Sequence, residues 1–110
     1  MGGADFYKHY EATLLAIENA VEAAVNEGDV EMDYETVNDI LTLTCADDST
    51  IIITPQSATS QLWLAARSGG FHFDLANGRW TCKTDGELLA DKLAAICSAQ
   101  GGLDVVFEGI

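Results

Sequence analysis

The sequence predicts an α+β domain, a two-layer α/β sandwich with two helices packed on one face of an antiparallel sheet of about six strands. Apolar residues recur at three- and four-residue steps near both ends of the chain, as in amphipathic helices. Between them, short runs of alternating apolar and polar residues are separated by turn-forming residues. The connections are short, which favours an antiparallel meander. We therefore expect the order helix, six strands, helix and C-terminal tail, in one domain spanning residues 1–110.

The composition is that of a globular protein with one core. The chain has 110 residues, 48% of them hydrophobic, and no apolar run approaches the ~20 residues of a membrane helix. The first residues lack a basic segment followed by an apolar one, so we expect no secretory signal and no membrane association. Three cysteines without a C-x-x-C pair favour a reducing compartment and buried free thiols.

The first helix is expected at about residues 5–26. Asp5 is placed to cap it and Gly28 to end it. Glutamates at positions 11, 18 and 22 fall on a different side from the apolar stripe. That stripe consists of Phe6, Tyr10, Leu14, Ile17, Val21 and Val25.

Three strands are expected next. The segment Asp29–Glu35 alternates strictly, so Val30, Met32 and Tyr34 are predicted to face inward and the four acids outward. Residues 36–39 form the following turn. The second strand is Ile40–Cys45, and the third is Thr50–Thr54, ended by the single proline.

The segment Gln61–Leu75 is predicted to form a hairpin at the centre of the sheet. Ser68-Gly69-Gly70 is its expected turn, because glycine supplies the positive φ of tight loops. One face is apolar, formed by Leu62, Leu64, Phe71 and Phe73. The other face, expected to meet water, carries Gln61, Trp63, Arg67, His72 and Asp74. A tryptophan there indicates either partial burial under a neighbour or an anchor for a binding partner.

The sixth strand is expected at Arg79–Lys83, with Trp80 and Cys82 on one side. Thr84 and Glu87 fit a capping box at the start of the second helix. Gly101-Gly102 is its expected end, and the tail that follows is either a short strand or an extended segment beside the helices. The apolar stripe of this helix consists of Leu89, Leu93, Ile96 and Cys97.

Negative charge is concentrated in the first half of the chain. The net charge is −13, and residues 1–48 hold 12 of the 18 acids but only one base, Lys8. This asymmetry favours a face that attracts cations or a basic partner, and five Lys and Arg in total disfavour nucleic acid. A solvated face, or an edge strand protected from aggregation by its charges, is the alternative.

The acids of residues 29–35 resemble the start of a calcium loop but do not complete one. Tyr34 stands at the required glycine position and Ile40 at that of the bidentate glutamate. Alternate strand residues lie ~6.6–7 Å apart, so two such carboxylates do not easily share one ion. Any metal site would be shallow and weak, and oxygen ligands favour hard cations such as calcium, magnesium, manganese or iron. No nucleophile elbow, P-loop or dinucleotide motif is present, which argues against an ordinary enzyme.

The order of elements, the acidic first helix and strand, and above all Gln61-x-Trp63-Leu64, Gly69-Gly70 and Phe71-His72-Phe73-Asp74 resemble the frataxin family, in particular its bacterial (CyaY-type) form. The resemblance runs from about residue 5 to 107. It implies a two-layer α/β sandwich and a non-enzymatic, cytoplasmic bacterial protein that binds ferrous and ferric iron weakly. It also implies docking to the cysteine desulfurase and scaffold protein of iron–sulfur cluster assembly, as an iron-responsive regulator and as a monomer without excess iron.

The resemblance assigns the metal site to seven acids of the first helix and strand: Glu18, Glu22, Glu27, Asp29, Glu31, Asp33 and Glu35. Trp63, Gln61, Arg67 and Glu11 are the expected partner-binding residues, with His72 and Asp74 as minor metal candidates. Asn19 and Ala23 stand where bacterial relatives often carry acids, which affects the number of iron sites. The alternatives are a metal-independent acidic adaptor that docks a basic protein, and an iron-storage or ferroxidase-like protein.

Overall fold

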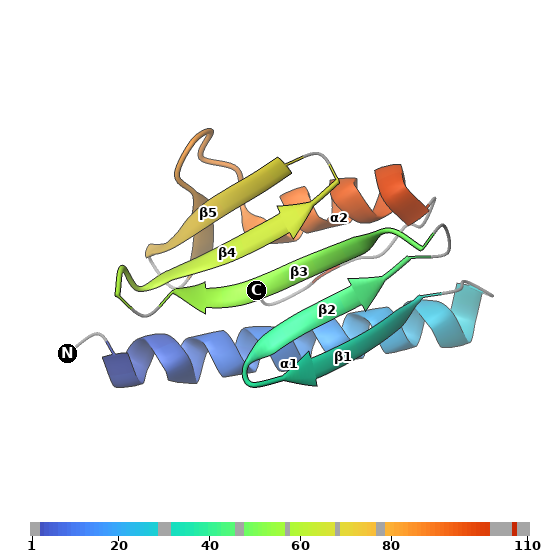
Figure 1. Cartoon of the computed structure of the whole chain (residues 1–110), viewed down its shortest axis with the longest axis horizontal. Helices are drawn as coiled ribbons and strands as arrows, with labels where there is room; N and C mark the ends of the chain where they lie inside the picture. Colours follow the sequence, from blue (N-terminus) through green and yellow to red (C-terminus); the bar gives the residue numbers. More distant parts are fainter. Residues whose placement is uncertain are drawn as a thin grey trace.

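The computed structural model describes residues 3–28, 32–45, 48–56, 58–67, 69–76, 79–101 and 107. Helix α1 (Gly3–Gly28) is followed by six strands and helix α2 (Leu89–Gly101). The strands are β1 (Asp33–Val37), β2 (Ile40–Thr44), β3 (Thr50–Gln56), β4 (Gln61–Ala66), β5 (Gly69–Ala76) and β6 (Arg79–Cys82). They form one antiparallel sheet in sequence order, and both helices lie on the same side of it (Figure 1). Neither described helix is long and apolar enough to cross a membrane.

The core lies between the sheet and the two helices. The register pairs Leu62 with Phe73 and Leu64 with Phe71, so the hairpin presents one apolar face as predicted. Both leucines and Phe73 are buried, and Phe71 is half-buried. The predicted stripes of both helices are buried against this face, except that Val25 is half-buried. All three cysteines are buried and none forms a disulfide, as expected.

The first strand differs from the prediction. It begins at Asp33 rather than residue 29, and all five of its residues are exposed. Met32 is buried just before it, but Tyr34, predicted to face inward, is 38% exposed. The strand lies at the edge of the sheet, where the core ends. Residues 29–31, which carry the rest of the prediction, lie outside the described residues.

The β1–β2 turn is shorter than the predicted segment 36–39. Only Asn38 and Asp39 form it, with φ of 53° and 66°. Two consecutive residues at positive φ are typical of a type I′ turn, whose twist suits a two-residue hairpin. Thr36 and Val37 therefore belong to β1.

Two further boundaries in the sheet were predicted wrongly. The strand β3 continues through Pro55, which pairs with Leu62. The β2–β3 register ends at Leu41 and Ile53, so β3 has one neighbour at Pro55, and a locally unpaired edge tolerates the missing N–H. The register also pairs Ala66 with Gly69, which places both hairpin glycines inside β5, rather than in the predicted turn.

The segment before α2 does not form the predicted capping box. The helix begins at Leu89, and the Leu88 carbonyl accepts a hydrogen bond from the Lys92 N–H at 3.0 Å. The Asp85 and Glu87 carboxylates instead bind the Lys92 ammonium, at 2.6 and 3.0 Å. Likewise, α1 begins at Gly3, so Asp5 lies within the helix rather than at its cap. The tail lies outside the described residues, apart from the buried Phe107.

Candidate functional site

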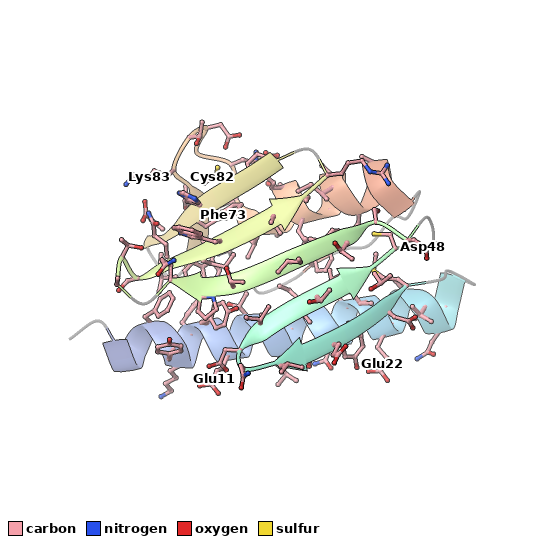
Figure 2. The ribbon with its side chains drawn as sticks, viewed as in Figure 1. Glu11, Glu22, Asp48, Phe73, Cys82 and Lys83 are labelled. Atoms are coloured by element: carbon pink, nitrogen blue, oxygen red, sulfur yellow. The ribbon has the colours of Figure 1, made fainter. Side chains whose placement is uncertain are left out.

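The helix α1 and the strand β1 together form an acidic edge, defined here by Glu11, Glu18 and Glu22 of α1 with Asp33 and Glu35 of β1. Figure 2 shows Glu11 and Glu22 on the side of α1 that runs along β1. The Thr36 hydroxyl donates a hydrogen bond to Glu18, and the Tyr34 hydroxyl donates one to Glu22 at 3.2 Å. These two bonds hold helix and strand together at the edge.

The acids of β1 lie on the opposite side of the strand from those hydroxyls. Tyr34 and Thr36 pair with the buried residues Leu43 and Leu41, so they are on the helix side of the sheet. The alternation of side chains along a strand therefore puts Asp33 and Glu35 on the other side. Glutamates of α1 and acids of β1 thus flank the edge strand from its two sides.

This arrangement does not form a closed metal site. Within the described part of the chain, no group of three or more His, Cys, Asp and Glu residues could hold a metal ion. A cation bound here would therefore be held by one or two carboxylates and would keep most of its waters, as hard cations such as Mg²⁺ commonly do. The spacing of the carboxylates along the acidic edge suits several weak cation sites.

One end of the acidic edge is hollowed. A depression of about 300 Å³ lies between the last turns of α1 and the start of β1. Its polar lining consists of Glu22, Asn26, Asp33 and Tyr34. Glu22 holds the pKa of Tyr34 above its usual value, mainly through their hydrogen bond, so Tyr34 stays a neutral donor. Here residues from both the helix and the strand border the same hollow.

Three further acids were predicted as metal ligands, and Glu11 as a partner-binding residue. Glu27 is exposed in the last turn of α1, beyond Glu22. Asp29 and Glu31 lie outside the described residues. Glu11, predicted to meet a partner, is exposed on the same helix face as Glu18 and Glu22, and between them Leu15 is 58% exposed.

The sheet face turned away from the helices, called here the open face, carries Trp63. Its indole stacks on His72, with ring centroids 4.2 Å apart and an interplanar angle of 12°. Its Nε1 donates a hydrogen bond to Gln61 Oε1 at 3.1 Å, and Gln61 Nε2 donates one to Asp74 Oδ1 at 3.0 Å. A network from three neighbouring side chains thus fixes the orientation of the half-buried tryptophan.

The prediction that Gln61 faces water is wrong. The residue is 5% exposed, because its side chain lies among Thr59, Trp63 and Asp74 and forms hydrogen bonds with all three. Gln61 therefore supports Trp63, and its role in binding a partner stays a prediction. Asp74 and His72 share its face but are engaged by Gln61 and Trp63, while Arg67, directly after β4, is exposed.

Sequence reasoning missed the hydroxyls of Tyr34 and Thr36 as partners of the acidic edge. Their spacing of two in an exposed edge strand matches the four-residue spacing of Glu18 and Glu22 on the helix. Two residues along a strand span about 6.6 Å, and four residues along a helix span about 6 Å. This match in spacing was the signal in the sequence that could have predicted the two hydrogen bonds.

Comparison with known proteins agrees with this architecture. A family model described as the frataxin-like domain matches residues 1–103. The fold is similar to a frataxin from Psychromonas ingrahamii, studied within the CyaY protein family, with a TM-score of 0.82 and 26% identity over 97% of this chain and 98% of that one.

Two yeast structures share the fold. Yeast frataxin superposes with a TM-score of 0.70 at 24% identity, over 88% of this chain and 80% of that one. A trimeric frataxin from Saccharomyces cerevisiae, in complex with ferrous iron, gives a TM-score of 0.59 at 29% identity, over 86% of this chain and 80% of that one. With the family model covering nearly the whole chain, these similarities show that the protein belongs to the frataxin family.

Proposed function

We propose that this protein binds iron weakly along its acidic edge and acts as an iron-responsive regulator of iron–sulfur cluster assembly in the bacterial cytoplasm. Members of its family are iron-binding proteins and are generally non-enzymatic. The observation that carries the proposal is the flanking of β1 by Glu18 and Glu22 on one side and Asp33 and Glu35 on the other. The ferrous complex of a yeast relative supports the choice of metal.

The proposed partners are the cysteine desulfurase and the scaffold protein. The acidic edge would attract basic surfaces of these proteins, and Trp63 would be the anchor on the open face. Iron and a basic partner would then compete for, or share, the carboxylates of the edge. This gives a physical route by which iron alters the effect of the protein on the desulfurase.

Iron binding is tested with charge-neutral variants. Glu18→Gln and Glu22→Gln retain an oxygen that accepts the bonds from Thr36 and Tyr34 while removing the negative charges. We expect the double variant to bind ferrous iron at least several-fold more weakly in anaerobic calorimetry. Asp91→Asn, which removes a charge from α2, is the matched control and should bind like the wild type. Equal affinities in all three proteins would contradict the proposed site.

A second candidate, a metal-independent acidic adaptor, is favoured by two observations. The described residues contain no group of three metal ligands, while Leu15 is 58% exposed between Glu11 and Glu18 on α1. An adaptor would bind the desulfurase equally well with and without a chelator. The iron-responsive regulator would change its affinity for the desulfurase, or the sulfide production rate, when ferrous iron is added anaerobically.

A further inference from the structure

The open face contains a shallow notch beside Trp63. It has a volume of about 110 Å³, and its lining includes Ile52, Trp63, Ala65, Gly70 and His72. The register explains it. Trp63 pairs with His72, and the next pair on the same face is Ala65 with Gly70. A pair of large aromatic side chains therefore lies next to a pair of very small residues, and the difference in size leaves the notch. Because an apolar cavity of about 150 Å³ holds one benzene molecule, this notch suits a single aliphatic side chain.

Gly70 keeps the notch open although the backbone does not require glycine there. It is absent from the glycines at positive φ, which in the described residues are Gly69 and Gly86. A Cβ at Gly70 would approach only the Leu64 carbonyl oxygen, at 4.0 Å, which is ordinary contact. Glycine inside a strand weakens it and often marks close approach of a ligand or another backbone. The fold therefore leaves space at Gly70 that a larger residue could fill.

The chemistry of the occupant follows from the row in which the notch lies. The register aligns Glu35, Thr42, Ile52, Ala65 and Gly70 across five strands. Neighbouring strands are ~4.8 Å apart, so Glu35 lies ~14 Å from the centre of the notch near Ala65. A basic residue of the occupant would match Glu35, whereas a second copy of this chain would bring another net charge of −13.

We propose that the notch seats one aliphatic side chain of the protein partner, and that a lysine or arginine about four residues away lies over Glu35. Four residues of extended chain span ~13 Å, which matches the distance across the row. The inference rests on the proposed function, which supplies a partner for the open face. It adds a specificity-determining position, Gly70, and a chemical pattern for the segment that docks.

The pattern is tested directly with a short peptide, independently of any natural partner. Acetyl-Lys-Ser-Ser-Ser-Leu-Ser-amide is titrated into the ¹⁵N-labelled protein in the presence of EDTA. We expect the amide signals of Ala65, Gly70 and Trp63 to shift, and the shifts to be lost when the peptide leucine is replaced by alanine. Shifts that are equal for both peptides, or that avoid these residues, would overturn the notch.

The partner complex is tested with two variants of similar bulk. Gly70→Leu fills the notch, and Thr50→Leu adds the same side chain at an exposed position on the same face. In EDTA, Gly70→Leu should weaken binding to the desulfurase or scaffold protein at least tenfold, and Thr50→Leu less than threefold. Equal effects would overturn the inference, provided that circular dichroism and Tm show both variants folded.

The two proposals fail in different ways. If neither the desulfurase nor the scaffold protein binds the wild type, the docking part of the proposed function is wrong. The peptide titration still shows whether the notch binds an aliphatic side chain. If Gly70→Leu binds ferrous iron like the wild type but loses the partner, the notch and the metal site are separate, as we expect.

Discussion

The acidic edge and the turn before α2 both bring carboxylates together, but they treat the charge differently. At the turn, Asp85 and Glu87 bind the ammonium of Lys92, whose residue is 9% exposed and whose Nζ lies 4.5 Å from the centroid of the Phe71 ring. At the edge, Glu18 and Glu22 accept hydrogen bonds from neutral hydroxyls. Those hydroxyls position the carboxylates but carry no charge that would neutralise them. The first cluster is therefore structural, and we propose that the second binds cations and basic partners.

Removing Lys92 should give the largest change in stability. Lys92→Ala leaves Asp85 and Glu87 without their cation and removes the lysine stem from the core, so we expect a loss of about 2 kcal/mol in the free energy of unfolding. Urea denaturation measures this loss. The exposed Lys83 is the control, and Lys83→Ala should cost less than about 0.5 kcal/mol. Similar losses for both lysines would show that the Lys92 cluster is not structural.

Hard divalent cations should stabilise the protein through the acidic edge and not through the turn. At tenfold excess over Kd, a ligand that binds only the folded state adds about 1.4 kcal/mol. Thermal unfolding with added divalent cations, against a control of matched ionic strength, measures the shift in Tm. Glu18→Gln/Glu22→Gln should lose most of the shift, and Asp91→Asn should retain it. A wild-type Tm that does not respond to divalent cations would remove the distinction between the two clusters.

The turn should also have a specific pH dependence. The hydrogen bond from Lys92, together with that from the Glu87 N–H, lowers the pKa of Asp85 to about 2. Because the folded pKa lies below the ordinary value, the stabilisation by ionised Asp85 is present above about pH 4 and is lost as pH falls towards 2. The stability difference between wild type and Asp85→Asn should therefore shrink over that range. If the stability difference between the two proteins does not change with pH, ionised Asp85 does not stabilise the fold through its ion pair with Lys92.

The smallest effect is expected at the hydroxyls of the edge. Thr36→Val removes the donor to Glu18 on an exposed strand and should cost about 0.5 kcal/mol of unfolding free energy. Thr42→Val on the neighbouring strand serves as the control, and chemical denaturation of both variants gives the difference. A larger cost at Thr42 would mean that the Thr36 bond does not hold the edge together.

The sequence predicted the fold best where the pattern was local and the core decided it. The alternation of residues 61–75 assigned both faces of the hairpin correctly. Leu62, Leu64 and Phe73 all lie on the face that the helices cover, and they are buried there. It failed at β1, where the edge of the sheet leaves Tyr34 on the helix side but outside the core. Alternation shows which residues share a side of a strand, but not whether that side is covered.

The remaining errors arose from side-chain contacts that the local sequence patterns do not reveal. Thr84 and Glu87 fit a capping box locally, but Lys92, in the helix that follows, binds Glu87 and Asp85 instead. Gln61 is polar and was expected to be exposed, but Asp74 from the next strand satisfies its amide. The acidic edge was predicted as a region, whereas the pairing of Tyr34 with Glu22 required the helix–strand register.

The central claim, that iron binds at the uncompensated edge and not at the compensated turn, is tested most directly by a residue-resolved NMR titration. Ferrous iron is added anaerobically to the ¹⁵N-labelled protein, and the broadened or shifted amides are mapped on the structure. We predict that they cluster around Glu18 and Glu22 in α1 and around Asp33 and Glu35 in β1, while those near Asp85 and Glu87 stay unchanged. Perturbations centred on the turn, or spread evenly over all acidic residues, would contradict the claim.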